Sequence, residues 1–192
     1  MKNLFKLAIL ALFVPFLSGC GYNTIVQQDE FINQTWSQVE NAYQRRADLI
    51  PNLVETVKGY ATFEKQTLTD VIEARAKATS VNINPSNLSP EAIQQFQAAQ
   101  GGLSSALARL MVVVEKYPDL KANQNFLELQ AQLESTENRI AFERKKFNDA
   151  VGEYNAGIRR FPRLIVAAIF GFKKRGYFEA AEGAEKAPAV KF

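Results

Sequence analysis

The sequence predicts an all-α protein, folded as an elongated antiparallel up-and-down bundle of three long helices with a short C-terminal helix. Apolar residues recur every three or four positions along most of the 192-residue chain, the spacing that lines up one face of an α-helix. Turn-forming residues interrupt this pattern at a few places only, and no long stretch alternates apolar and polar residues as a strand does. Long helices joined by short turns pack antiparallel with small crossing angles.

The first long helix is predicted to run from about Ile25 to Thr79. Pro51 lies inside it, where a proline removes one backbone donor and crowds the carbonyl of Ala47. The apolar stripe keeps its phase on both sides of the proline, so we expect a continuous, kinked helix; a true break at residues 48–51 is the alternative. The stripe consists of Ile32, Trp36, Val39, Tyr43, Ala47, Ile50, Val54, Val57, Ala61, Leu68 and Val71.

The second helix is predicted to start after a loop at residues 79–88. Ser89 can cap it, Pro90 suits the first helical position, and Glu91 favours the positive end of the helix dipole. Two glycines at 101–102 interrupt the stripe; close packing against a neighbouring backbone explains them, and a bend is the alternative. The stripe consists of Ile93, Phe96, Ala99, Leu103, Ala106, Leu110, Val114 and Tyr117.

The third helix is predicted to be capped by Asp119 and to stop at Pro162. A short apolar helix at 163–172 follows, and three cations stand at 173–175. Residues 179–192 are small and charged without an apolar period, so we expect a disordered tail. The stripe of the third helix consists of Phe126, Leu129, Leu133, Thr136, Ile140, Phe147, Val151, Tyr154, Ile158 and Phe161.

The composition excludes several classes of function. The chain has no histidine and one cysteine, Cys20, so the usual general base, disulfides within the chain and Cys/His metal sites are absent. We therefore expect no cofactor, no metal and no enzymatic activity. Removal of Lys2 and Lys6 with an N-terminal signal lowers the formal net charge from +3 to +1, too little for a nucleic-acid-binding surface.

The N-terminus has the layout of a secretory signal. Two lysines precede an apolar run at residues 7–16, and small residues lead to Cys20. Residues 17–20, Leu-Ser-Gly-Cys, resemble the lipobox of bacterial lipoproteins, so we expect cleavage after Gly19 and lipid on the Cys20 sulfur. The alternatives are an uncleaved membrane helix, for which the run is short, and an ordinary signal peptide before an incidental thiol. Because Gly21 is not an aspartate, an outer-membrane destination is favoured if the organism has such a membrane.

Three stretches carry a family resemblance. They are WSQVENAYQRRADLIPNLVETVKGY at 36–60, EKYPDLKANQNFLELQAQLESTENRIAFERKKFNDAVGEYN at 115–155 and FPRLIVAAIFGFKKRGYFEA at 161–180, with EARAKA spacing at 73–78 between them. This combination closely resembles the LemA family of bacterial membrane-associated proteins over residues 22–180. The resemblance implies a helical fold at a membrane and no assigned chemical activity.

Two polar clusters match polar positions of the LemA motif, one around Pro51 and one on the third helix. Their functional interpretation is a groove that receives a partner segment; the preferred alternative is a ladder of interhelical ion pairs and hydrogen bonds that fixes register, with solvated i,i+4 pairs. Asn52 and Asn148 are the preferred binding residues because a neutral amide gains little by facing water. The candidate binding residues are Arg45, Asp48, Asn52, Glu55, Asn138, Arg144 and Asn148. The remaining cluster members are Arg46, Lys58, Glu137, Arg139, Asp149 and Asn155.

The apolar residues 164–172 allow a second membrane contact, since three cations follow them and lipid surfaces attract such patches. Nine residues are too few to span a bilayer, and folding back over the end of the bundle is the preferred alternative.

The sequence therefore predicts a lipid-anchored, extracytoplasmic binding or scaffold module without enzymatic activity. The partner is an unidentified envelope protein, and the oligomeric state is open. An adaptor or regulator of a membrane-bound protease is the alternative. The predicted organisation is a signal peptide at 1–19, a lipidated lead at 20–24, the helical bundle at 25–178 and a tail at 179–192.

Overall fold

The computed structural model describes residues 2–60 and 64–179, with side chains from Gly21 onward apart from that of Ser86. Every regular element in this part of the chain is helical, which confirms the all-α prediction. The elements are α1 (Lys2–Lys58), α2 (Lys65–Ser80), the short 3₁₀ turn η1 (Pro85–Asn87), α3 (Pro90–Val114), α4 (Pro118–Lys121), α5 (Gln124–Gly157) and α6 (Arg163–Phe170).

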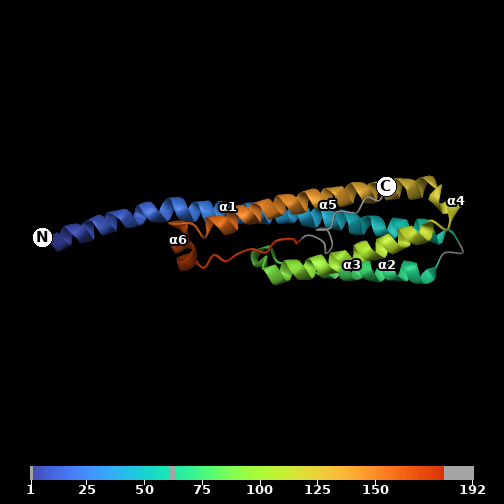
Figure 1. Cartoon of the computed structure of the whole chain (residues 1–192), viewed down its shortest axis with the longest axis horizontal. Coiled ribbons are helices and arrows are strands. Elements are labelled where there is room, and N and C mark those ends of the chain that lie inside the picture. The colour runs from blue at the N-terminus through green and yellow to red at the C-terminus, as the bar shows by residue number, and fades with distance from the viewer. Residues whose placement is uncertain (1, 61–63, 180–192) are drawn as a thin grey trace, which may run out of the picture.

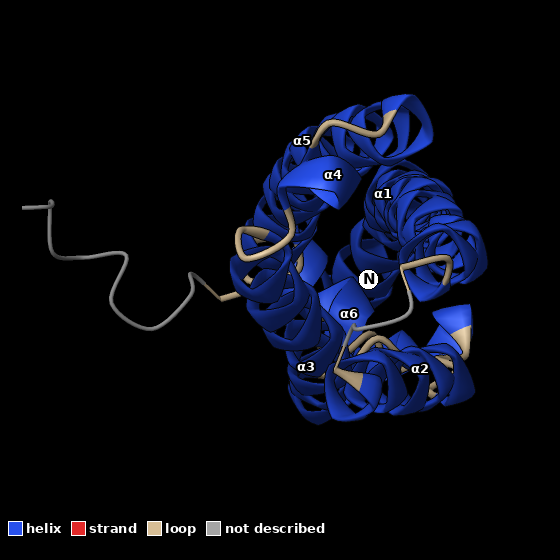
Figure 2. Ribbon diagram, turned by 90° about the vertical axis from the view of Figure 1, so that its right-hand side faces the viewer, coloured by secondary structure: helices blue, strands red, loops and turns tan. Residues whose placement is uncertain are grey.

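The four longest helices lie side by side along the long axis of the molecule (Figure 1). α1 packs antiparallel to α5, and α2 packs antiparallel to α3. Viewed along the axis, the α1–α5 and α2–α3 pairs enclose the core between them (Figure 2). α6 lies at the end of the bundle from which the N-terminal turns of α1 project, and α4 lies at the opposite end.

The bundle contains four long helices rather than the predicted three. α1 ends at Lys58, where Gly59 follows and the amide of Tyr60 donates to the carbonyl of Val57 at 3.1 Å. Glycine is about 1 kcal/mol less favourable than alanine in a helix, so this position favours an end. The predicted continuation to Thr79 is therefore wrong. The turn gives no signal in the apolar spacing, because α2 resumes the phase of the apolar stripe after it. The residues that resume it are Leu68, Val71 and Ala78, all buried.

α1 also begins earlier than predicted, at Lys2 rather than near Ile25. A Cβ atom placed on Gly21 would lie 3.5 Å from Cγ2 of Val166, so α6 packs against α1 at this position. The helix continues through Pro51, which confirms the predicted continuity there. The alternative break at residues 48–51 is wrong.

The start of α3 is as predicted. Ser89 Oγ accepts the Ala92 amide at 3.3 Å, and Pro90 occupies the first turn. The glycines at 101–102 do not pack closely against a neighbouring backbone, contrary to the prediction: a Cβ at either would meet nothing within 4 Å. They are exposed on a helix that continues to Val114.

The predicted cap of the third long helix is wrong. Asp119 belongs to the separate four-residue helix α4, and Asn123 caps α5 instead. The Asn123 Oδ1 atom accepts the Phe126 amide at 3.1 Å. At its other end α5 stops at Gly157, five residues before the predicted stop at Pro162.

The apolar stripes form two core clusters. One is built around Trp36, Phe96 and Phe147 near α6, and the other fills the far half of the bundle. Phe161 departs from its predicted core position, with 79% of its surface exposed just beyond α5. Ala61 and residues 180–192 of the tail predicted at 179–192 lie outside the described residues. Glu179, the first residue of that predicted tail, is held by Gln97 through both its N–H and its C=O. The predicted stripe residues buried on α1 are Ile32, Trp36, Val39, Tyr43, Ala47, Ile50, Val54 and Val57.

A polar layer lies between the two clusters. The guanidinium of Arg46, 1% exposed, donates to Glu137 Oε1 at 2.7 Å, to Ser104 Oγ at 2.8 Å and to Gln100 Oε1 at 2.7 Å. Gln100 in turn donates to the carbonyl of Ala78 at 3.2 Å. Arg46 of α1 therefore joins α3 and α5 directly, and α2 through Gln100, so this polar layer links all four long helices.

Candidate binding groove

Residues 172–179 form an extended segment, here called the C-terminal strap, that runs back from α6 along the bundle (Figure 1). Gly171 ends α6 in the left-handed conformation, with φ of +72°, which favours glycine and reverses the chain. The Gly176 amide then donates to the carbonyl of Leu88 at 2.9 Å. The strap thereby lies between α5 and the start of α3.

Three side-chain amides hold the backbone of the strap. Asn155 accepts the Arg175 amide and donates to the Arg175 carbonyl, both at 2.9 Å. Asn148 pairs in the same way with Phe178, at 2.9 and 2.8 Å, and Gln97 with Glu179, both at 3.1 Å. A carboxamide carries one donor group and one acceptor, so it satisfies an extended residue as a neighbouring strand would.

Phe178 anchors the strap in the core. It is 4% exposed, and its ring centroid lies 6.0, 5.5 and 6.3 Å from those of Trp36, Phe147 and Phe96. The guanidinium of Arg144 lies 4.8 Å from the Phe178 ring centroid, and its Nη2 donates to the Glu179 carbonyl at 2.8 Å. The groove therefore combines backbone pairing with one aromatic socket closed by a cation.

Two contacts fix the other end of the strap. Arg175 forms a bidentate ion pair with Asp29 of α1, at 2.8 to 3.0 Å. The Tyr154 hydroxyl donates to the Lys173 carbonyl at 3.0 Å. Burial of the phenol, together with the nearby Asp29 carboxylate, raises the pKa of Tyr154 to about 12, so the hydroxyl keeps the proton that it donates.

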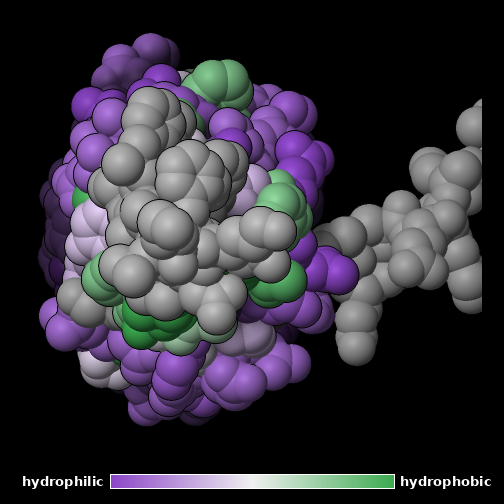
Figure 3. Space-filling model, turned by 90° about the vertical axis from the view of Figure 1, so that its left-hand side faces the viewer, coloured by the Kyte–Doolittle hydropathy of each residue, from purple (hydrophilic) through white to green (hydrophobic). Residues whose placement is uncertain are grey.

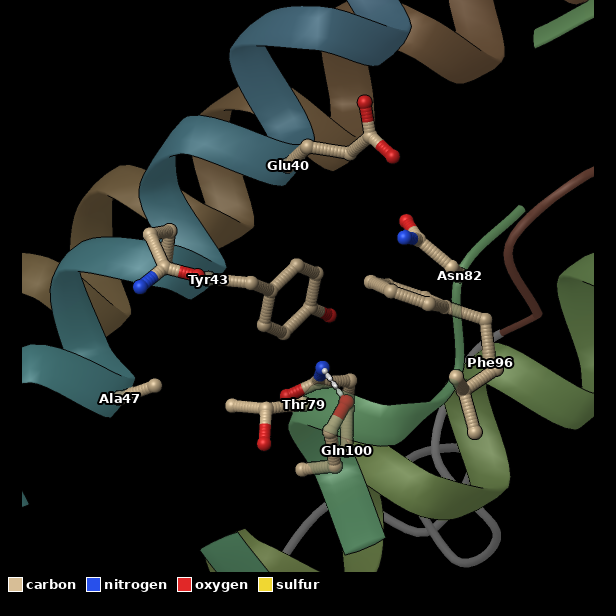
Figure 4. Close-up of a pocket in the computed structure, with 10 residues that line it drawn as sticks. Glu40, Tyr43, Ala47, Thr79, Asn82, Phe96 and Gln100 are labelled. Carbon is tan, nitrogen blue, oxygen red and sulfur yellow. Dashed lines mark hydrogen bonds between the residues drawn. The ribbon is translucent and has the colours of Figure 1, made fainter. Parts of the chain in front are cut away.

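A small cavity of about 100 Å³ lies on another face, between α1 and the α2–α3 connection (Figure 4). The Tyr43 ring lies edge-on to Phe96 there, with centroids 5.0 Å apart, and Glu40 and Asn82 stand at its rim. Burial raises the pKa values of Glu40 and Tyr43. Sites for small molecules usually enclose about 300–1,000 Å³, so this cavity is too small to be the principal site.

The structure brings only part of the predicted site together. Arg144 and Asn148 lie in the groove, where the partner segment they contact is the chain's own strap. Asn138 lies on the same helix but is exposed.

The predicted row on α1 is also exposed. Arg45 lines an open pocket of about 350 Å³ between α1 and α5, together with Leu49 and residues between 131 and 136. Two members of the row bond to neighbours on α1: Asp48 accepts a hydrogen bond from Gln44, and Glu55 accepts one from Lys58, both at 2.7 Å. The row consists of Arg45, Asp48, Asn52 and Glu55.

Sequence reasoning missed several groove residues. Gln97 lies beside the apolar stripe of the second predicted helix, on the polar side, where a glutamine is expected and gives no signal of a binding role. Phe178 follows the last periodic helix, so no apolar spacing marks it as core. Asp29 and Arg175 are distant in the sequence and give no local signal of their ion pair. The family-like stretch at 161–180 was the one feature that pointed to this segment.

The fold and the groove together define an elongated helical bundle that holds an extended segment between its helices. The model of the LemA family matches residues 35–192, so the chain belongs to the LemA family. Among the described residues, no helix is long and apolar enough to cross a membrane. In the same part of the chain, no group of three His, Cys, Asp or Glu side chains is placed to hold a metal ion.

The chain is similar to proteins of three bacteria. It is 30% identical over 176 residues to magnetosome protein MamQ of Magnetospirillum gryphiswaldense, an alignment that covers 82% of this chain and 64% of MamQ. The identity to MamQ 1 and MamQ 2 of Paramagnetospirillum magneticum is 29% over 177 residues, with the same coverage. Protein LemA of Metamycoplasma hominis is 24% identical over 161 residues, covering 83% of this chain and 69% of that protein. The chain thus spans less than two thirds of the length of the MamQ proteins.

Proposed function

We propose that this protein is a membrane-anchored, non-enzymatic binding and scaffold module whose groove binds the backbone of extended polypeptide. One observation carries the proposal: Asn148, Asn155 and Gln97 each pair with both the N–H and the C=O of one strap residue. Such pairing recognises the main chain of the bound segment rather than its side chains, as happens when a strand is added to the edge of a sheet.

The strap behaves in this proposal as a tethered ligand. Because it is joined to the bundle, its effective concentration at the groove is high, and a partner must displace it to bind. The single deep side-chain socket, occupied by Phe178, selects a partner segment that carries an aromatic residue. An envelope protein with an exposed extended segment of this kind is the partner we expect.

The groove can be opened by one substitution. A Cβ atom on Gly176 would lie 2.7 Å from Cα of Pro90 and 2.9 Å from the carbonyl oxygen of Ser89, too close for either backbone to remain in place. Gly176→Ala should therefore displace the strap while leaving the three side-chain amides unchanged. Gly101→Ala is the matched control, since a Cβ there meets nothing within 4 Å.

Affinity capture from detergent-solubilised membranes tests the proposal. Gly176→Ala should recover severalfold more of a bound envelope protein than the wild type or Gly101→Ala. Adding Asn148→Leu to Gly176→Ala should remove the gain, whereas adding Asn138→Leu, an exposed asparagine of the same helix, should not. Equal recovery with all of these variants would contradict a binding role for the groove.

The anchor belongs to the proposal as well. The lipobox-like residues 17–20 and the short apolar run before them support lipid on Cys20 and an extracytoplasmic bundle. Intact-mass measurement of the membrane-purified protein should give a chain that starts at Cys20 and carries acyl mass. Cys20→Ser should leave the precursor unprocessed; an unmodified wild-type chain would contradict lipidation.

A further inference from the structure

α6 lies directly beside the proposed anchoring point. The position of a Cβ on Gly21 is 3.5 Å from Cγ2 of Val166 and 3.7 Å from Cγ of Arg163, so α6 packs against α1 one residue after Cys20. Val166 and Ala167 are the buried side of this short helix. Folding back over the end of the bundle, the alternative preferred from the sequence, therefore describes the inner face of α6.

The outer face of α6 remains apolar and exposed. Leu164 and Ile165 are 52% and 51% exposed, and Ile169 and Phe170 are 72% and 58% exposed. The ring of Tyr22 lies 4.7 Å from that of Phe170, which joins α1 to this surface. Seen from this end, hydrophobic side chains form patches near the middle of the surface, with hydrophilic ones beyond them (Figure 3).

Cations flank this apolar helix in the sequence. No aspartate or glutamate occurs between Glu153 and Glu179, a stretch that carries six basic residues. One of them, Arg175, pairs with Asp29. Among the described side chains, no carboxylate lies within ion-pair distance of the other five: Arg159, Arg160, Arg163, Lys173 and Lys174.

We propose that this surface, α6 with its flanking cations, docks on an anionic lipid bilayer. Apolar side chains that enter the headgroup region, beside cations that meet lipid phosphates, are the chemistry of an interfacial helix. Eight residues are too few to span the hydrocarbon core, so α6 lies in the interface. The contact supplies the second signal that stable anchoring by lipid requires, and it fixes the orientation of the bundle relative to the membrane.

This inference shares with the proposed function only the placement of the N-terminal segment at a membrane; it is independent of the groove. Tryptophan reporters on the full-length chain test it. Ile169→Trp places a reporter on the surface, and Val112→Trp places one on an apolar residue, 68% exposed, near the end of α3 at the other end of the bundle. The native Trp36 is fully buried and contributes a constant background.

The protein is reconstituted in phosphatidylglycerol vesicles with or without bromine on the acyl chains. The emission of Ile169→Trp should be quenched by about half or more, while that of Val112→Trp should stay unchanged. In phosphatidylcholine vesicles the quenching should fall several-fold. A variant that combines Arg159→Gln, Arg160→Gln, Lys173→Gln and Lys174→Gln should reduce the quenching in phosphatidylglycerol in the same way, since each removed cation weakens surface binding about fivefold.

Equal quenching of the two reporters, or equal quenching in both lipids, would overturn the inference. So would an Ile169→Trp reporter that is shielded from aqueous iodide but not quenched by brominated lipid, because a protein surface then covers α6. A chain that floats with vesicles and shows no quenching refutes this inference alone. A chain that fails to float refutes the proposed anchoring as well.

Discussion

Arg75 of α2 donates its Nε–H to the backbone carbonyl of Ala47 in α1, over 2.8 Å. In an uninterrupted α-helix this carbonyl accepts the amide of residue 51, which here is Pro51 and has no N–H. The proline therefore exposes an acceptor in the middle of α1, and the neighbouring helix supplies the missing donor. The proline thereby serves as a docking point between two helices that sequence reasoning joined into one.

The first prediction is that Arg75 and Pro51 are energetically coupled. Arg75→Met should lower the free energy of unfolding by about 1–2 kcal/mol, because a charged donor to a partly buried carbonyl is lost. In a Pro51→Ala background the loss should be smaller, since the restored amide satisfies Ala47. Pro51→Ala itself should keep the fold and its helical circular dichroism. Identical losses in both backgrounds would show that the carbonyl contact contributes nothing.

The second prediction concerns the buried cation that joins the helices. Arg46→Ala should lower the free energy of unfolding by about 3 kcal/mol or more, because it removes a fully buried partner from three hydrogen-bonding side chains. Lys145→Ala breaks an exposed ion pair with Asp149 of the same helix and should cost about 1 kcal/mol or less. Denaturant titration of the two variants measures both free energies of unfolding. Similar decreases would contradict the idea that the polar layer fixes the register of the helices.

The third prediction compares two glycines. Gly176→Ala should speed hydrogen exchange at the Phe178 and Glu179 amides, because the added methyl group displaces the strap from Pro90. Gly101→Ala should leave that exchange unchanged and stabilise α3 by about 1 kcal/mol. Protected strap amides in Gly176→Ala would mean that the strap accommodates the methyl group without leaving the groove.

The fourth prediction concerns alkaline pH. An unfolded tyrosine titrates near pH 10, whereas Tyr154 in the folded protein keeps its proton to about pH 12. Between these values the unfolded chain binds fewer protons than the folded one, so the free energy of unfolding falls as pH rises; below pH 10 the contribution is fully present. Tyr154→Phe should show a shallower decline over this window. Some decline will persist because the pKa of Tyr43 is raised as well.

Residue periodicity predicted the core well and the connections poorly. Trp36, Phe147 and Tyr154 are buried where the stripe placed them, because burial of a helix face depends on local spacing. The turn after Lys58 was missed because α2 resumes the same phase. The spacing of apolar residues shows which face of a helix is apolar. It does not show whether the chain turns back between two successive helices.

The groove could be predicted only in part. Asn148 was selected because a neutral amide gains little from water, and it does bind an extended segment. Asn52 was selected by the same reasoning but is exposed on α1. The difference is that the strap packs against Asn148 and not against Asn52. The sequence around Phe178 has no apolar period, so it does not predict where the strap lies.

Recognition of extended backbone by the groove can be measured with the strap sequence supplied as a separate peptide. A labelled peptide of residues 173–179, KKRGYFE, is titrated into full-length Gly176→Ala, with the wild type and Gly101→Ala beside it. The opened variant should bind the peptide saturably and about tenfold or more tightly than the other two, whose groove is occupied. Asn148→Leu in the opened variant, or alanine in place of Phe178 in the peptide, should weaken binding about tenfold or more. A peptide that fails to bind the opened variant, or that binds it equally well without the Asn148 amide, would contradict a groove that recognises extended backbone.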